Sequence, residues 1–196
     1  MEVIILLSLI FLNALFVVSE IALISARKSR LESMANKGDE KAKAALLLIE
    51  NPERFLSTAQ IGMTLIAILT GVYSGEKFGK DLEPFVKQVV FLKPYSDVIS
   101  TSIVVIIVTF LSIIFGELMP KKLGLIKAEK IARVVAGPMN KLSSIVYPFV
   151  WILSGITSIL FKILNIKKPS DSAVTEEEIK AMISEASEHG SIDEDE

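Results

Sequence analysis

The chain alternates between long apolar runs and short charged segments, a pattern that predicts membrane-spanning helices. Residues 3–26 form an apolar run that contains one charge, Glu20. Residues 56–75 carry no charge, and residues 98–119 carry only Glu117. At a rise of about 1.5 Å per residue, each run is long enough to cross a hydrocarbon core of about 30 Å. We therefore expect an all-α membrane protein with three transmembrane helices.

The first apolar run begins almost at the start of the sequence, so it must be distinguished from a cleavable signal peptide. It lacks the basic segment in front and the small-residue cleavage site behind that mark such peptides. We expect it to be retained as a helix.

The charged segments between the runs indicate how the chain is oriented. Residues 27–55 hold seven lysines and arginines and residues 121–141 hold six, whereas residues 76–97 hold four lysines and four acids. Because strongly basic segments stay in the cytoplasm, the two basic segments are expected inside and the balanced one outside. This predicts a multi-pass protein of the cell membrane with its N-terminus outside and its C-terminus in the cytoplasm.

The basic segment 27–55 is predicted as a cytoplasmic connector with a helix of its own. Residues 41–49 have the spacing of an amphipathic helix. Asn51 and Pro52 then end that helix and begin the next, because proline interrupts a helix but suits its first turn.

A fourth apolar stretch, residues 142–161, has two interpretations. A full crossing would carry the basic residues 162–168 and the acidic tail to the outside. Basic residues flank the stretch on both sides, and Pro148 and Gly155 lie within it. These features favour a bent pair of short helices in the cytoplasmic leaflet, or re-entering from it, over a fourth span.

The pattern divides the chain into three parts. Residues 1–141 form the three-span core, residues 142–169 the juxtamembrane or re-entrant helices, and residues 170–196 an acidic helical linker. The linker holds ten acids against one lysine, and Thr175 with Glu178 fits a capping box at the start of a helix. Because the sequence stops at four acidic residues, we expect the natural chain to continue into a soluble domain.

Composition limits the chemistry. The chain has no cysteine and one histidine, His189, which excludes thiolate and imidazole metal clusters, cysteine nucleophiles and a serine–histidine hydrolase. A bound metal must take oxygen ligands, which favours hard cations such as Mg²⁺ or Ca²⁺. We expect no enzymatic activity, since the sequence has no nucleophile–base pair. We expect no nucleic-acid binding either, since the basic residues flank the spans.

Two carboxylates at membrane depth, Glu20 and Glu117, are the first candidates for function, because a charge there is costly unless it is paired, protonated or faces water. After Glu117, Pro120 has no N–H and crowds the carbonyl of Gly116, four residues earlier. The released oxygen lies beside a carboxylate, an arrangement with which broken membrane helices build cation sites. Alternatively, each carboxylate lies near the headgroups and Pro120 merely ends the helix.

Polar and small side chains recur at helical spacing in all three runs. On the first helix, Asn13 and Glu20 are seven residues apart and share one face. The residues that recur on the other two helices are Gln60, Thr64, Ala67 and Gly71, then Thr109, Ser112 and Gly116. One such stripe alone often serves helix packing. Three stripes together with two carboxylates indicate a shared polar cavity.

The candidate residues stand in short motifs of specific order. These are Asn-Ala-Leu-Phe at 13–16, Ser-Glu-Ile-Ala at 19–22, Ser-Ala-Arg-Lys-Ser-Arg-Leu at 25–31, Asn-Pro at 51–52, Thr-Ala-Gln-Ile-Gly at 58–62 and Phe-Gly-Glu-Leu-Met-Pro-Lys at 115–121. Over nearly its whole length, the chain resembles the transmembrane domain of the CNNM/CorC magnesium transporters, including their hemolysin-related bacterial branch. The tail segment 175–179 resembles the family's link toward its paired CBS domains.

The resemblance implies a homodimer in the lipid bilayer, with three spans per subunit and juxtamembrane helices on the cytoplasmic side. It implies transport of Mg²⁺, most simply efflux, with the dehydrated ion held by side-chain and main-chain oxygens. Asn13, the Gly116 carbonyl and Glu117 are then expected near the ion. It further implies regulation by CBS domains that bind ATP and would follow the present sequence.

One position departs from the family pattern. Many members carry asparagine directly after the glycine of the second helix, where this chain has Met63 after Gly62. A thioether is a poor ligand for Mg²⁺, so either Thr64 takes this role or the substrate differs. Some relatives with similar segments are associated with polyamine export, and an acid-lined cavity would also suit an organic polycation.

These arguments give a defined set of site residues. The predicted metal ligands are Asn13, Glu20, Thr64, Gly116 and Glu117. The residues predicted for the ion pathway and helix break are Ser19, Gln60, Gly62, Ser112 and Pro120. Three functions remain open, which are Mg²⁺ transport, polyamine export and a non-transporting membrane scaffold or regulator.

The acidic tail is predicted to sense Mg²⁺. Its candidate residues are Glu176, Glu177, Glu178 and Glu185. In a dimer, two such helices would repel each other unless cations bridged them. The alternative is a solvated helix followed by a disordered end.

Overall fold

The computed structural model describes residues 1–164. The predictions for the linker, among them Glu176, Glu177, Glu178 and Glu185, lie outside the described residues. Within residues 1–164 the chain consists of helices and their connections, which confirms the predicted all-α membrane fold. Met1–Trp151 form one compact unit, the described residues 152–164 belong to a second, and each unit is considered by itself.

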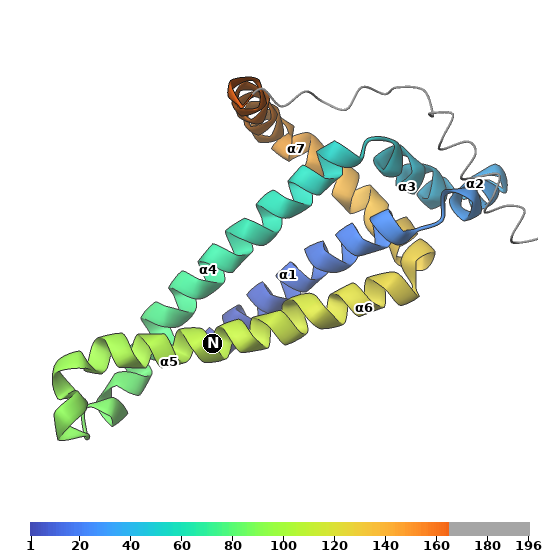
Figure 1. The fold of residues 1–196 in the computed structure, drawn as a ribbon. Coiled ribbons are helices and arrows are strands. Elements are labelled where there is room, and N and C mark those ends of the chain that lie inside the picture. Colours follow the sequence, from blue (N-terminus) through green and yellow to red (C-terminus); the bar gives the residue numbers. More distant parts are fainter. Residues whose placement is uncertain (165–196) are drawn as a thin grey trace, which may run out of the picture. The chain divides into compact units, whose positions relative to one another are not determined.

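Three long helical segments correspond to the three predicted spans. They are α1, Glu2–Ser25, then α4, Pro52–Val86, and a third segment made of α5, Ser96–Ile113, η2, Ile114–Leu118, and α6, Met119–Ile126 (Figure 1). A short 3₁₀ helix, η1, Val90–Tyr95, precedes α5. Helix α4 packs against α1 and α5, and α1 also contacts η2 and α6. The three segments therefore form a bundle in which α1 touches both others.

Helix α4 is longer than the predicted run of residues 56–75. It continues through a charged segment in which Glu76 pairs with Lys80 at 3.5 Å and Glu83 pairs with Lys87 at 2.9 Å. Pairs four residues apart stabilise exposed helical turns, so the helix does not end where the apolar run ends.

The fourth apolar stretch lies in a single helix, α7, Ala128–Ile163, so the predicted pair of short helices is wrong. Pro138 and Pro148 lie inside α7. A proline removes one backbone hydrogen bond, and apolar helices tolerate this loss where neighbouring groups compensate. By length and composition, the described chain has four helices that could cross a membrane, whereas three spans were predicted.

The basic connector folds into a helical hairpin, α2, Lys28–Asn36, and α3, Glu40–Glu50. Gly38, between the two helices, has a φ of +91°, which L side chains rarely adopt. Helix α3 confirms the predicted helix over residues 41–49, and α4 begins at Pro52 as predicted. The fully buried alanines that pack the hairpin against the neighbouring helices are Ala22, Ala42, Ala45, Ala59, Ala132 and Ala136. Such small side chains allow the helix backbones to approach closely.

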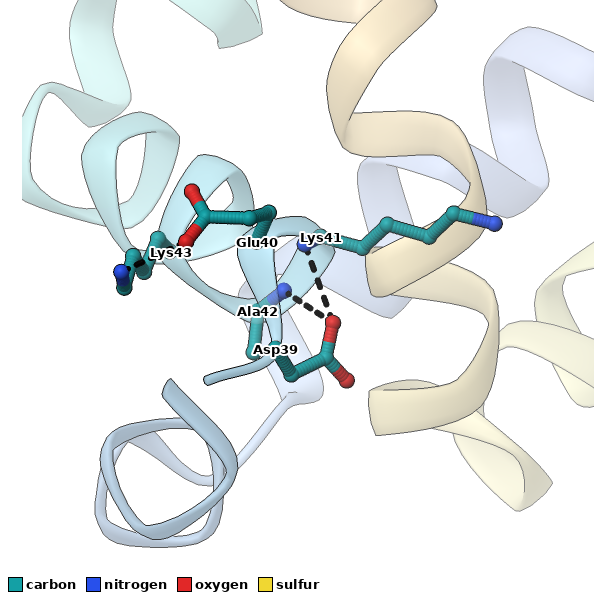
Figure 2. A network of polar contacts seen from close by, with 5 residues as sticks. All are labelled: Asp39, Glu40, Lys41, Ala42 and Lys43. Atoms are coloured by element: carbon teal, nitrogen blue, oxygen red, sulfur yellow. Dashed lines mark hydrogen bonds and ion pairs between the residues drawn. The ribbon is translucent and has the colours of Figure 1, made fainter. Parts of the chain in front are cut away.

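Asp39 holds this hairpin through both of its carboxylate oxygens. Its Oδ1 accepts hydrogen bonds from the backbone N–H groups of Lys41 at 3.0 Å and Ala42 at 3.2 Å (Figure 2). Its Oδ2 forms an ion pair with Arg133 of α7. Asp39 thus caps α3 and links it to α7.

Asp39→Ala is expected to lower the free energy of unfolding by about 1 kcal/mol or more, because the helix cap and the ion pair are both lost. Asp39→Asn retains an oxygen that caps α3 and loses only the charge, so it should keep most of the stability. Thermal unfolding in detergent, followed by circular dichroism, measures both variants. Equal losses in the two variants would contradict the capping role.

Candidate functional site

The third helical segment changes its winding at Gly116 and Glu117. Residues Ile114–Leu118 form η2, a turn of the wider π-helix between α5 and α6. Such turns hold one extra residue, interrupt the regular backbone hydrogen bonds and frequently occur at functional sites. Pro120 follows as the second residue of α6 and is buried.

Gly116 is the point at which η2 meets α1. Its carbonyl oxygen accepts a hydrogen bond of 3.1 Å from Asn13 Nδ2, although the two residues are 103 positions apart. A Cβ at Gly116 would lie 3.3 Å from Asn13 Nδ2 and 3.5 Å from the Ile10 carbonyl oxygen. The absence of a side chain therefore allows the two helices to approach closely, and Asn13 to reach the backbone oxygen.

The other end of the Asn13 amide is left without a protein partner. Its Oδ1 is buried and accepts no hydrogen bond from any residue within 1–164. Ser112 Oγ, one turn before Gly116, is likewise buried without a partner among the described residues. Burying a polar atom without a partner costs free energy, so both oxygens are suited to receive a cation or a water molecule.

Two adjoining cavities lie beside Asn13. We call the larger one, of about 500 Å³, the carboxylate cavity; its lining includes Glu20, Gln60, Met63, Thr64 and Lys121. We call the smaller one, of about 220 Å³, the hydroxyl cavity; its lining includes Thr70, Gly71, Ser74, Thr109 and Ser112. The residues that line both cavities are Asn13, Ala67 and Glu117. Asn13 and Glu117 therefore stand at the boundary between them.

The carboxylate cavity contains three charged side chains. Glu117 Oε1 forms an ion pair of 2.6 Å with Lys121 Nζ, one turn further along, and Glu20 enters the same cavity from α1. Two carboxylates and one ammonium leave one net negative charge, which attracts cations. Among the described residues there is no group of three or more acidic or histidine side chains that could hold a metal. A metal ion here would take most of its ligands from neutral oxygens.

The structure brings most of the predicted site residues together. Those that line one or both cavities are Asn13, Glu20, Gln60, Thr64, Ser112 and Glu117. Gly116 is buried beside them, and Pro120 is buried in the following turn.

Two predicted residues lie elsewhere. Ser19 faces a different side of α1, where its Oγ donates a hydrogen bond of 2.6 Å to the Leu15 carbonyl. There it lines a mainly apolar cavity together with residues of α7. Gly62 packs against the ring of Phe16, and a Cβ at Gly62 would lie 2.5 Å from ring carbons. Gly62 therefore sets the contact between α1 and α4 and does not line either cavity.

Sequence reasoning missed three polar or charged residues that line the cavities, Thr70, Ser74 and Lys121. The charge pattern places Lys121 among the basic residues that flank the third span, but its spacing of four from Glu117 also indicates an ion pair on one helical face. Ser74 continues the stripe of small and polar residues on the second helix by one turn, and Thr70 lies beside it. Extension of that stripe by one turn would have indicated both Thr70 and Ser74.

Comparison with known proteins agrees with this architecture. The family model described as the cyclin M transmembrane N-terminal domain matches residues 4–196. The chain is 42% identical to the UPF0053 protein sll0260 of Synechocystis over 186 residues, which cover 95% of this chain and 42% of that protein. It is 33% identical to the UPF0053 protein YhdT of Bacillus subtilis over 186 residues, which cover 94% of this chain and 40% of that protein.

A third relative carries a functional name. The chain is 33% identical to the polyamine export protein of Haemophilus influenzae over 186 residues, which cover 93% of this chain and 42% of that protein. The chain thus spans about two fifths of the length of these relatives. The family match and the long apolar helices support a multi-pass location in a membrane. The chain therefore belongs to the family of cyclin M (CNNM) transmembrane domains, the family that its motifs resemble.

Proposed function

We propose that this domain transports cations across the membrane and that Mg²⁺ is its substrate. The proposal depends above all on the Asn13 amide. Its nitrogen is fixed on the Gly116 carbonyl, and its oxygen is buried without a partner among the described residues, at the boundary of the two cavities. An oxygen held in this way offers a ready ligand to a hard cation.

The groups around Asn13 fit the preferences of Mg²⁺. This ion binds through one or two carboxylates, keeps several water molecules and requires oxygen ligands at about 2.0–2.1 Å. Glu117 supplies a carboxylate and Ser112 a hydroxyl oxygen next to Asn13. In the carboxylate cavity, Glu20 provides a further carboxylate and Thr64 a further neutral oxygen.

Lys121 supports selection for doubly charged ions. Its ammonium group forms an ion pair with the Glu117 carboxylate, so a cation that binds Glu117 competes with this ammonium. Coulomb attraction grows with charge, and a divalent ion therefore competes with the ammonium better than Na⁺ or K⁺ does.

The wider arrangement follows from the family resemblance. We propose Mg²⁺ efflux by a homodimer in the cell membrane, with the N-terminus outside and the C-terminus in the cytoplasm. The relatives are more than twice as long as this chain, which leaves room for a cytoplasmic region that regulates transport. ATP would act only through CBS domains in that region, and the acidic linker would sense Mg²⁺.

Polyamine export is a second candidate, and Met63 is the observation that favours it. This side chain lines the carboxylate cavity, where its apolar surface suits a methylene chain better than a metal ion. Glu20 and Glu117 would receive ammonium groups, as Glu117 already receives that of Lys121. Relatives from Haemophilus influenzae and Escherichia coli are named polyamine export proteins. A scaffold without transport activity is less well supported, because a cavity adjoins both carboxylates.

Flux measurements in proteoliposomes separate these candidates. We expect the purified protein to carry Mg²⁺ into liposomes that contain a Mg²⁺ indicator, and an excess of spermidine to leave that flux unchanged. Inhibition of Mg²⁺ flux by spermidine, together with uptake of labelled spermidine, would favour polyamine export as the function. Movement of neither substrate would contradict transport by this domain.

A further inference from the structure

We propose that the substrate crosses the membrane within a single subunit, along α4, and passes between α4 and α5 beside Glu76 and Asp97. This inference rests on the proposed function. It adds the half of the route that the residues around Asn13 do not cover. Its starting point is a third cavity, of about 330 Å³, which we call the mouth cavity. The residues that line it are Gly71, Val72, Gly75, Glu76, Lys80, Asp97, Thr101 and Val105.

The three cavities follow one another in a row. The carboxylate and hydroxyl cavities share Asn13, Ala67 and Glu117. The hydroxyl and mouth cavities share Gly71 and Val105. Each cavity thus meets the next at common wall residues, and α4 contributes to the wall of all three.

The length of this row matches a membrane. On α4 it extends from Gln60, in the carboxylate cavity, to Lys80, in the mouth cavity. About 20 residues of helix correspond to roughly 30 Å, which is the thickness of the hydrocarbon core. The row therefore has the length of a full crossing, and the mouth cavity lies at the end of α4 that the charge pattern predicts to be outside.

The middle of the row offers oxygen atoms to a cation. Thr70 Oγ1 donates its hydrogen to the Ile66 carbonyl at 2.7 Å, and Ser74 Oγ donates to the Gly71 carbonyl at 3.2 Å. Both side chains are buried, and because their hydrogens are used, they present oxygen lone pairs. Ser112 Oγ, which has no partner within residues 1–164, lies in the same cavity. Oxygens suited to a cation therefore continue beyond Asn13 toward Gly71.

The glycines of α4 show where α4 and α5 are far enough apart for the route and where they are in close contact. A Cβ at Gly71 would meet no atom within 4 Å, so the wall is open there. A Cβ at Gly75 would lie 3.3 Å from Thr101 Cγ2, and one at Gly79 would lie 2.8 Å from Thr101 Oγ1. Beyond Gly75 the two helices are thus in close contact, and the route has to turn outward beside Glu76.

The charges of the mouth cavity repeat those of the carboxylate cavity. Glu76 pairs with Lys80 at 3.5 Å, and Asp97 at the start of α5 adds a second carboxylate. Two acids and one lysine again leave one net negative charge, so cations are attracted at both ends of the row.

Cysteine accessibility tests this route, because residues 1–196 contain no cysteine and a single thiol introduced into them reacts alone. We expect Gly71→Cys in proteoliposomes to react with a cationic, membrane-impermeant methanethiosulfonate reagent. The modification should lower Mg²⁺ flux more than tenfold, and Mg²⁺ should slow it. Leu69→Cys is the matched control, since Leu69 is exposed on α4 and lines none of the three cavities. It should react more than tenfold more slowly and transport normally.

The labelling rates of the two variants, measured by mass spectrometry, test the proposed route independently of transport. Equal rates at Gly71→Cys and Leu69→Cys would overturn the proposal, as would complete modification of Gly71→Cys with unchanged flux. Failure of the unmodified protein to move Mg²⁺ would instead contradict the proposed function. In that case, fast labelling at Gly71→Cys would still support a water-filled row of cavities.

Discussion

Glu117→Gln is expected to lower Mg²⁺ flux at least about a hundredfold while leaving the protein folded. The substitution keeps the shape of the side chain and removes the charge at the boundary between the two cavities. A unit charge about 4 Å from a cation contributes about 4 kcal/mol where the effective dielectric constant is about 20, so its loss weakens ion binding severely. The Lys121 ammonium, now without its partner, would also repel the cation. Proteoliposome flux with a Mg²⁺ indicator measures the effect.

Two further variants control this experiment. Glu53→Gln removes a carboxylate from the first turn of α4 that lines neither cavity, so its flux should match the wild type. Glu117→Gln combined with Lys121→Met removes both partners of the ion pair and should recover part of the lost flux. Thermal unfolding should change little in any of them, because Glu117 is 45% exposed and exposed ion pairs contribute little stability. Wild-type flux in Glu117→Gln would rule out Glu117 as an ion ligand.

Gly62→Ala is expected to destabilise the bundle clearly, although it adds only one methyl group. Its Cβ would lie 2.5 Å from carbons of the Phe16 ring, a separation that side chains do not tolerate. Either the ring moves or α1 and α4 separate, and overpacking of this kind costs about 1–3 kcal/mol. Thermal unfolding and size-exclusion chromatography in detergent report the loss. Transport should fall too, because α1 and α4 together line the carboxylate cavity.

The same helix supplies the control for Gly62→Ala. A Cβ at Gly71 meets no atom within 4 Å, so Gly71→Ala should unfold at the wild-type temperature or slightly above it, because alanine favours the helix. The double variant Gly62→Ala, Phe16→Leu replaces the ring with a smaller side chain and should recover much of the lost stability. Equal losses in Gly71→Ala and Gly62→Ala would show that the contact with Phe16 does not explain the loss, because helix propensity alone favours alanine over glycine at both positions.

The apolar pattern was sufficient to predict the bundle, because apolar length and helix-breaking residues are local properties of the sequence. The three long segments, the helix α3 and the start of α4 at Pro52 all follow from them. The single helix α7 did not follow, because Pro148 was given the weight that it has in a soluble helix. In a membrane helix, a proline is tolerated where neighbouring groups satisfy the carbonyl that it leaves without a partner.

The candidate site was predictable where spacing on one helix determined it. Asn13 and Glu20 were placed on one face by helical geometry, and both line the carboxylate cavity. The direction of Ser19 was not foreseen, although adjacent residues differ by about 100° around a helix and Ser19 cannot share the face of Glu20. The hydrogen bond between Asn13 and Gly116 depends on how two distant segments pack, and no local pattern encodes it.

The π turn at Ile114–Leu118 has a mechanical consequence for the helix that carries Glu117. A turn that holds one extra residue can return to regular winding by passing that residue along the helix, which rotates the following residues by about 100°. Such a rotation would swing Glu117 and Lys121 away from Asn13 and release the bond on Gly116 without any tilt of the whole helix. If the domain transports cations as proposed, rewinding of this single turn would break and re-form the hydrogen bond between Asn13 and the Gly116 carbonyl.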